Sequence, residues 1–407
     1  MTTVTERFFR YVTVNTTSSE ESTTFPSTAS QLAFGQTLAE ECRQIGLADA
    51  VRDDFGYVYA TLPATAPGYP TIGLIAHMDT SPQASGQNVR PQIHRAYDGG
   101  DIVLEGVTIS PAEFPFLQNY IGCDIITASG DTLLGADDKA GVAEIMTAME
   151  YLLAHPEIPH GPVRIAFTPD EEVGSGADHF DVARFGAAYA YTMDGDALGE
   201  LQYENFNADK AVIRITGKSV HPGSAKGIMV NAARVAARFA EAVPLAESPA
   251  GTEGYEGFYH LTHMRGEVES AQLEYILRGF EAEGNARRIA FLQQLAADIS
   301  AETGALIEVE VTEQYRNMRE VVEACPAALD LAKAALSACG LDPQTIPIRG
   351  GTDGSRLSFM GLPCPNLGTG GHNFHGPYEL ITVQAMEQAV LVIAKLCELA
   401  VDFPVQM

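Results

Sequence analysis

Histidines and carboxylates stand directly after several short apolar runs of this sequence, and side chains of these types bind metal ions. If the apolar runs are parallel strands of one sheet, their polar tails open together at its carboxyl edge, where open α/β sheets place their ligands. Such groups suit Zn²⁺ or a similar borderline ion, and one carboxylate more than coordination needs indicates a catalyst rather than a structural site. The residues in question are His77, Asp79, Asp137, Asp138, Asp170, Glu171, Glu172, Asp194 and His375.

His77 and Asp79 are two residues apart, so in a strand both side chains point to the same side and can face one pocket. A metal-binding histidine uses one ring nitrogen for the ion, while a carboxylate often accepts a hydrogen bond from the other nitrogen. We therefore predict that His77 is a ligand and that Asp79 orients it. The alternative is a structural histidine at a strand end, capped by a nearby aspartate.

Asp137 and Asp138 precede an apolar helical pattern at 139–154, and a helix N-terminus offers unpaired backbone N–H groups. One of the two aspartates can therefore be an N-cap, which is the competing interpretation for Asp138. Asp137 is the better ligand candidate. The two oxygens of a carboxylate can bridge metal ions roughly 3.5 to 4 Å apart, as in two-metal hydrolytic sites.

Glu171 and Glu172 follow the apolar run at 163–167. A pair of glutamates is usually a solvated turn, but surface turns rarely follow a fully apolar buried strand directly. One glutamate of the pair can coordinate a metal while the other handles the protons of the attacking water. Asp194, after the run at 188–193, completes the same edge.

Two histidines compete for the role of second nitrogen ligand, His375 and His372, in the stretch 370–376. Spacing alone leaves both open, although His375 is the preferred candidate. The glycines of this stretch do not form a phosphate loop, because neither GxxxxGK[ST] nor a strand-GxGxxG-helix unit occurs. Nucleotide binding is therefore not expected.

Alternating strand and helix patterns must position these residues, and they predict an α/β fold with a mostly parallel sheet flanked by helices. Around residue 207 the pattern changes to four strand-like runs and two helices, which form a compact α+β unit. We predict a catalytic domain made of residues 1–206 and 317–407, with an inserted lid or dimerisation domain at 207–316. The Pro- and Gly-bearing stretch 81–130 is expected to be an ordered excursion over the surface.

The chain has 407 residues, of which 25 are basic and 53 acidic, and its formal charge is −28. This charge argues against nucleic acid and anionic membranes as partners, because binding them needs clusters of Lys and Arg. It favours cations, either metal ions or ligands with a free amino group. Charged residues interrupt the N-terminal stretch and the six cysteines are scattered, so we expect reduced thiols, no signal peptide or membrane span, and a cytoplasmic location.

Six strings of residues carry a resemblance that runs nearly end to end. They make the chain similar to the two-zinc peptidase and deacylase superfamily, and within it to the tripeptide aminopeptidases. The strings are His77-Met-Asp-Thr-Ser-Pro82, Leu134-Gly-Ala-Asp-Asp-Lys-Ala-Gly141, Phe167-Thr-Pro-Asp-Glu-Glu-Val-Gly174, Val220-His-Pro-Gly223, Arg349-Gly-Gly-Thr-Asp-Gly354 and Thr369-Gly-Gly-His-Asn-Phe-His-Gly376.

The resemblance implies two Zn²⁺ ions per subunit, with Co²⁺ or Mn²⁺ as alternatives, bridged by Asp137. Its ligands for one ion match His77 and Asp194, and its ligands for the other match Glu172 and His375. It thereby selects the first aspartate of the pair as the bridge and His375 over His372.

The resemblance further implies that Glu171 is the general base, with Asp79 behind His77. The inserted unit resembles the superfamily's lid, whose histidine, His221 here, helps to stabilise the oxyanion and often does so in the partner subunit's site, which favours a homodimer. A guanidinium forks onto a carboxylate, so Arg278 and Arg349 are candidates for anchoring the substrate carboxylate, although either can instead be a scaffold salt bridge.

The resemblance, together with the candidate metal site, implies a di-zinc aminopeptidase that releases the N-terminal residue from tripeptides by attack of activated water. A dipeptidase or an N-acyl amino acid deacylase on the same scaffold is an alternative, because the metal ligands alone do not fix the substrate. A non-catalytic metal-binding protein is an alternative from another class. Glu171 distinguishes it, since a protein that only binds metal has no need of a general base.

Overall fold

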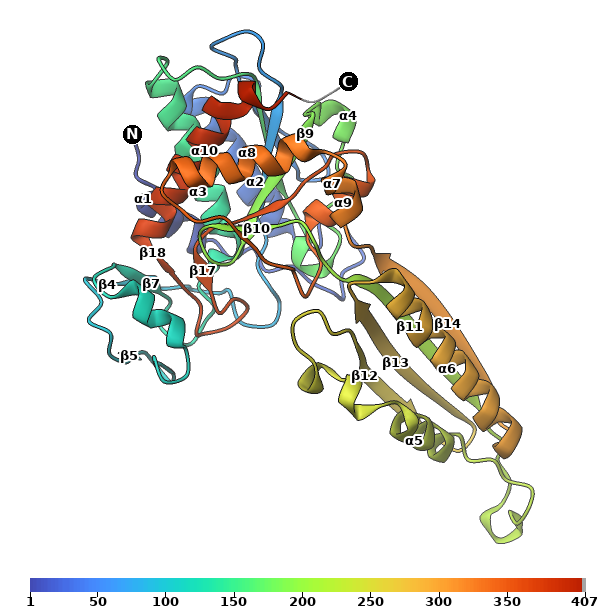
Figure 1. Ribbon diagram of the computed structural model, residues 1–407. Helices are drawn as coiled ribbons and strands as arrows, with labels where there is room; N and C mark the ends of the chain where they lie inside the picture. Colours follow the sequence, from blue (N-terminus) through green and yellow to red (C-terminus); the bar gives the residue numbers. More distant parts are fainter. Residues whose placement is uncertain (405–407) are drawn as a thin grey trace. The chain divides into compact units, whose positions relative to one another are not determined.

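The computed structural model describes residues 1–404, which form two compact units (Figure 1). The first unit contains Met1–Tyr203, Met318–Ile346 and the described chain from Thr352, and the second contains Glu204–Asn317 and Pro347–Gly351. From the sequence, residues 347–351 are expected in the last catalytic segment, 317–407. In the structure the Ile348 N–H donates to the Glu204 carbonyl at 2.8 Å, which ties this stretch to the second unit. The lid and dimerisation roles of the second unit stay predictions.

An eight-stranded sheet forms the centre of the first unit, in the order β1-β2-β8-β3-β9-β16-β10-β15. Its middle is parallel, with β8 and β9 on either side of β3, and Ile72 pairs with both Val163 and Tyr189. All six residues of β3 are buried, as expected for a strand covered on both faces. This mostly parallel sheet confirms the predicted fold class. The strands are β1 (Val51–Arg52), β2 (Val58–Leu62), β3 (Ile72–His77), β8 (Val163–Thr168), β9 (Tyr189–Gly195), β10 (Glu200–Gln202), β15 (Gln344–Thr345) and β16 (Asn366–Gly368).

Helices pack against this sheet and against one another. α3 lies on β3 and β9, and α1 and α10 pack on α3 (Figure 1). A separate buried cluster joins Phe185 of α4 and Leu357 of α9 to Ile75 and Ala166 of the sheet. Strand and helix therefore alternate as the sequence predicts. The helices of this unit are α1 (Val4–Val12), α2 (Ala29–Ile45), α3 (Ala136–Ala154), α4 (Val182–Phe185), α7 (Arg319–Glu323), α8 (Pro326–Ala338), α9 (Asp353–Phe359) and α10 (Val383–Leu399).

The stretch 81–130 has a core of its own rather than lying only over the surface. Its strands β4 (Gln92–His94) and β7 (Ile125–Thr127) join β17 (Gly371–His372) and β18 (Leu380–Thr382) in a four-stranded sheet, and β5 (Ile102–Val103) pairs with β6 (Thr108–Ile109). A buried apolar cluster fills this region. Its members are Tyr97, Ile102, Ile109, Leu117, Ile125 and Leu380.

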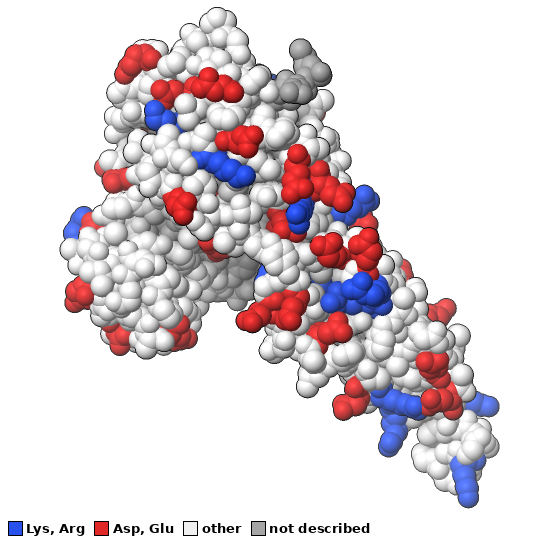
Figure 2. Space-filling view, viewed as in Figure 1, with Lys and Arg blue, Asp and Glu red and all other residues white. Residues whose placement is uncertain are grey.

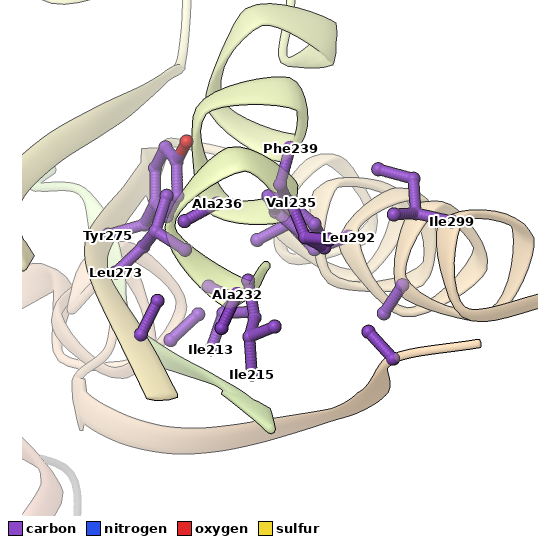
Figure 3. Close-up of a cluster of buried hydrophobic side chains, with 14 of the residues drawn as sticks. Ile213, Ile215, Ala232, Val235, Ala236, Phe239, Leu273, Tyr275, Leu292 and Ile299 are labelled. Atoms are coloured by element: carbon purple, nitrogen blue, oxygen red, sulfur yellow. The ribbon is translucent and has the colours of Figure 1, made fainter. Parts of the chain in front are cut away.

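The second unit is an antiparallel sheet in the order β12-β13-β11-β14 with two helices, α5 and α6. Every second residue of β13 is buried, so the apolar face of the sheet follows the period of two of a strand. Figure 3 shows how side chains from α5 and α6 meet this face in one apolar core. The elements are β11 (Asn207–Thr216), α5 (Ala232–Ala242), β12 (Phe258–Gly266), β13 (Ser270–Gly279), α6 (Ala282–Thr303) and β14 (Leu306–Tyr315).

Charged side chains of both signs lie on the surface. Figure 2 shows acidic side chains scattered over the visible face of both units, with basic side chains between them. Among the described residues, no helix combines the length and apolar character that crossing a membrane requires.

Candidate metal centre

Three neighbouring strands of the main sheet bring most of the predicted residues to one edge. His77 is the last residue of β3, Glu171 and Glu172 begin the short turn η2 (Glu171–Val173) after β8, and Asp194 lies near the end of β9. Because β3 runs parallel to both β8 and β9, these carboxyl ends meet. The arrangement is the one expected from the apolar runs that precede each residue.

The start of α3 adds the two adjacent aspartates, and the structure separates their roles. The backbone is not helical at Asp137 or Asp138. Oδ1 of Asp138 accepts the Gly141 N–H at 3.1 Å, and its Oδ2 accepts the His77 N–H at 3.0 Å. Asp138 thus caps the helix and fastens it to β3, as the competing interpretation of this residue expected, whereas the side chain of Asp137 turns to the histidines.

Asp137 gives one oxygen to each of two groups of potential ligands. Oδ1 lies 2.7 Å from Nε2 of His77, which is also 3.3 Å from Oδ1 of Asp194. Oδ2 lies 3.1 Å from Nε2 of His375, which is also 3.0 Å from Oε2 of Glu172. In each group the ligand atoms all lie within 4.8 Å of one another. The geometry is that of two adjoining cation sites that share a carboxylate.

Asp79 lies beside His77 and also beside the turn that carries Glu171 and Glu172. Its Oδ1 lies 3.3 Å from Nδ1 of His77, although without hydrogen-bond geometry, and the buried Nδ1 has no hydrogen-bond partner among residues 1–404. The two oxygens of Asp79 accept the backbone N–H groups of Glu171 at 3.1 Å and of Glu172 at 3.2 Å. One buried carboxylate therefore faces the ring of a candidate ligand and holds the turn that carries both glutamates.

Like charges crowd the site. Burial raises the pKa of Glu172 to about 7, with help from Asp137, and burial raises the pKa of Asp194 to about 6. Burial also raises the pKa of Glu171 well above its usual range, although His77 opposes the shift. Several buried carboxylates cannot all ionise together unless cations compensate them.

The two histidines near Asp137, His77 and His375, have pKa values that the surrounding carboxylates raise. Burial alone lowers the pKa of His77, but the surrounding carboxylates, Asp194 first, outweigh it and raise the pKa well above the usual value. His375 is affected in the same way by Asp137 and Glu172, and its pKa rises to about 11. In the absence of a metal ion, protons on these rings therefore balance the charge.

The residues present fit a pair of divalent cations. The donor set has two imidazole nitrogens and three carboxylates, which suits Zn²⁺ and related ions. Oε1 of Glu172 is buried and lacks a hydrogen-bond partner in the described part of the chain, so a donor atom remains for an ion. The charge of these side chains and the positions of their donor atoms therefore both suit two divalent cations.

His372 lies outside both ligand groups. Its Nε2 pairs with the Tyr120 hydroxyl at 2.6 Å, and its ring stacks on Phe116 at a centroid distance of 4.3 Å. Burial lowers the pKa of His372 to about 4. Of the two competing histidines, the structure thus brings His375 to Asp137 and places His372 in an aromatic cluster.

The three residues named for oxyanion and substrate binding lie in the second unit. His221 is exposed, and its Nδ1 accepts the Gly223 N–H at 3.1 Å. The guanidinium of Arg278 lies 5.2 Å from the Tyr315 ring. Arg349 donates to the carbonyls of Gly254 at 2.5 Å and Glu256 at 3.1 Å and lies over Phe206, so its contacts are those of a scaffold residue.

Three further buried carboxylates lie outside both ligand groups, namely Asp170, which the sequence places among the metal-binding candidates, and Asp353 and Glu379, to which it assigns no role. Asp170 accepts hydrogen bonds from Ser27 and Gln31, and Asp353 accepts one from the Thr168 hydroxyl at 2.7 Å. Glu379 accepts the backbone N–H groups of Leu134 and Gly135, before α3, and of Asp137, in its first turn. Asp170 and Asp353 lie inside strings that carried the resemblance, whereas no apolar strand pattern precedes Glu379.

Comparison with known proteins identifies the family of the chain. The family model of peptidase family M20/M25/M40 matches residues 134–399. A peptidase T from Desulfitobacterium hafniense (strain Y51) is 54% identical over 404 residues, covering 98% of each chain. Two solved structures share the fold over 98% of both chains, an aminopeptidase from Bacillus cereus ATCC 10987 (TM-score 0.76, 24% identity) and a tripeptidase from Staphylococcus aureus (TM-score 0.78, 21% identity). The chain belongs to peptidase family M20/M25/M40 and, within it, to the peptidase T proteins.

Proposed function

We propose that this metallopeptidase is a two-zinc aminopeptidase that releases the N-terminal residue of tripeptides. The observation that carries the proposal is the position of Asp137, which shares its two oxygens between two groups of ligands. The names of the similar proteins support the substrate class, since they include peptidase T, an aminopeptidase and a tripeptidase.

In this proposal His77 and Asp194 would hold one ion, Glu172 and His375 would hold the other, and Asp137 would be shared by both. Two divalent cations in such a site acidify water and polarise the scissile carbonyl. Asp79 is the proposed partner that orients the ring of His77, since its Oδ1 lies 3.3 Å from Nδ1.

Glu171 is the proposed general base. Its carboxylate takes a proton from the attacking water and returns that proton to the nitrogen of the leaving amine. The backbone contact from Glu171 to Asp79 supports this role, because it holds the glutamate beside the ligands without using its own carboxylate. The neighbouring Glu172 is the ligand of the pair, and its Oε2 lies 3.0 Å from Nε2 of His375.

The substrate contacts proposed outside the metal centre come from the second unit. We assign oxyanion stabilisation to His221, in a homodimer if it acts on the partner's site. Arg278 and Arg349 both remain candidates for anchoring the substrate carboxylate. Each guanidinium also donates to backbone carbonyls, from Arg278 to Asp209 and Leu277 and from Arg349 to Gly254 and Glu256. An acidic chain of charge −28 also suits a substrate that enters with a free amino group.

Metal analysis of the purified protein, combined with a series of substrates, tests the proposal. We expect two metal ions per chain and cleavage of Gly-Gly-Gly well above Gly-Gly, tetraglycine and N-acetylated amino acids. Preferred cleavage of Gly-Gly would indicate a dipeptidase. Cleavage of acylated compounds alone would indicate a deacylase, and either result would contradict the aminopeptidase assignment.

A further inference from the structure

A fully buried glutamate outside the ligand set holds the loop that carries Asp137. Oε2 of Glu379 accepts the backbone N–H groups of Leu134 at 2.6 Å and Gly135 at 2.8 Å. Its Oε1 accepts the N–H of Asp137 itself at 3.1 Å. Both oxygens of this carboxylate are therefore used on the main chain of one short loop, and only 1% of the residue is exposed.

The same residue is tied to the segment that carries His375. The backbone N–H of Glu379 donates to the carbonyl of Gly376, the residue after His375, at 3.2 Å. Glu379 then leads directly into β18, which pairs with β7 and β17. One residue thus links the segment of the shared carboxylate to the segment of a histidine, although the two are 238 positions apart in the sequence.

The loop needs such an acceptor because its backbone is not helical where the ligand stands. At Asp137 the backbone dihedrals are φ −82° and ψ 106°, so its N–H lies outside the regular hydrogen bonds of α3. A buried N–H without an acceptor is costly, and a carboxylate accepts more strongly than a neutral oxygen. We propose that Glu379 is a positioning residue that fixes the Asp137 loop so that both cations bind.

A change at Glu379 should affect metal binding differently from the loss of a single ligand. Asp137 reaches His77 with one oxygen and His375 with the other, so a displaced Asp137 disturbs both groups at once. Loss of Glu172 or Asp194 removes a ligand from one group. The inference rests on the proposed ligand set, and it predicts that a change at residue 379 weakens both ions together.

Glu379→Gln tests this prediction, because glutamine keeps the shape but has one acceptor oxygen and places an NH₂ group against a backbone donor. We expect the affinity for both Zn²⁺ ions, measured by competition with a metal-buffering chelator, to fall about 10- to 100-fold, the usual effect of losing a partner that orients a metal ligand. The absorption bands of the Co²⁺-loaded protein should also change, which a general loss of stability would not produce.

Glu144→Gln is the matched control. Glu144 is equally buried, lies on the same helix as Asp137, and neither of its oxygens has a hydrogen-bond partner among residues 1–404. The same carboxylate-to-amide change there should leave the Zn²⁺ affinities and the Co²⁺ spectrum unaltered. Glu379→Asp, which keeps both oxygens on a shorter chain, should bind Zn²⁺ with intermediate affinity and is the second variant if the glutamine variant does not fold.

The hydrogen bonds from the Asp137 loop to Glu379 can also be tested in the unaltered protein. Hydrogen exchange followed by mass spectrometry should show slow exchange in the peptide that covers residues 133–141, and faster exchange there in Glu379→Gln. The inference is overturned if this loop exchanges freely in the unaltered protein, or if both Glu379 variants bind two ions with unchanged affinity. If the unaltered protein binds no metal, the proposed function itself fails, so the two failures are distinguishable.

Discussion

Asp79 joins the ligand His77 to the two glutamates with a single buried carboxylate. One of its oxygens lies 3.3 Å from Nδ1 of His77, while the two oxygens accept the backbone N–H groups of Glu171 and Glu172. The direction of the metal-facing imidazole and the direction of the proposed general base therefore depend on the same group. The spacing of His77 and Asp79 in a strand predicts the first contact, but the second arises only when β8 lies beside β3.

The role of Glu171 is testable by replacing its carboxylate with an amide. Glu171→Gln should lower kcat for a tripeptide by at least ~10²-fold, because the amide accepts no proton from water. Zn²⁺ content should remain two per chain, since Glu171 belongs to neither ligand group. Glu172→Gln is the control that should lose one ion. Unchanged turnover in Glu171→Gln would remove this residue from the mechanism.

Ligands and supporting residues differ in how well the sequence predicts them. His77, Glu172 and Asp194 follow apolar strands, so a pattern points to each. The choice between His375 and His372 could not come from spacing, because both stand in one Gly-rich string and only the pairing of β17 with β18 sends His372 to Tyr120. Glu379 could not be predicted because its partners are backbone groups more than 200 positions away.

Helix α3 brings Asp137 to the edge of the sheet because it lies unusually close to β9. A Cβ added at Gly141 would stand 2.0 Å from the Met193 carbonyl oxygen and 2.4 Å from Oδ1 of Asp138. Only a residue without a side chain allows this approach. The distance between Asp137 and Asp194, which lies one residue after Met193, thus depends on a glycine in the interior of the helix.

Gly141→Ala should therefore destabilise the first unit. Alanine gains about 1 kcal/mol over glycine in a helix, but overpacking against a backbone carbonyl typically costs about 1–3 kcal/mol, so the clash wins. We expect a lower urea midpoint and weaker Zn²⁺ binding. Gly350→Ala is the control, because its added Cβ meets nothing closer than 4.0 Å and should leave both measurements unchanged. A Gly141→Ala protein as stable as the unaltered one would show that α3 can shift freely.

Short strands explain why the stretch 81–130 was predicted less well than the main sheet. Its strands have two or three residues, which is too few to show an alternating pattern. Its sheet is also completed by β17 and β18 from the far end of the chain, so the pairing is invisible locally. By contrast, β3 and α3 are long and apolar, and their patterns predict both elements and the edge where the ligands meet.

The metal centre draws on most of the length of the chain. Its ligands run from His77 to His375, and the second unit is inserted between Asp194 and His375. Every proposed ligand nevertheless lies in the first unit. The ions should therefore stabilise a unit whose first segment is separated from its later segments by more than a hundred residues of the other unit, and their removal should destabilise the whole first unit.

Metal removal should lower the stability of the protein more as the pH rises. Without ions, burial raises the pKa of Asp194 to about 6 and of Glu172 to about 7, and carboxyls with raised pKa values cost stability once the pH exceeds their unfolded values near 4. The carboxylates around His375 raise its pKa to about 11 despite its burial. The protonated ring therefore contributes stability that is lost as the pH rises above about 6.5. Together these effects weaken the metal-free fold as the pH rises, the two carboxyls between about pH 4 and about pH 7 and His375 above about pH 6.5.

Calorimetry of the Zn²⁺-loaded and EDTA-treated protein measures this effect. Ligand binding to the folded state alone adds about 4 kcal/mol when free metal is 1,000 times the dissociation constant. The Tm of the loaded protein should therefore exceed that of the treated protein, and the gap should widen from about pH 5 to about pH 8.5, first as the metal-free carboxyls ionise and then as the stabilising effect of the His375 proton is lost. Asp137→Asn, which removes the shared carboxylate, should show a small gap at both values. A gap that narrows with rising pH would mean that repulsion among these carboxylates is not what the ions relieve.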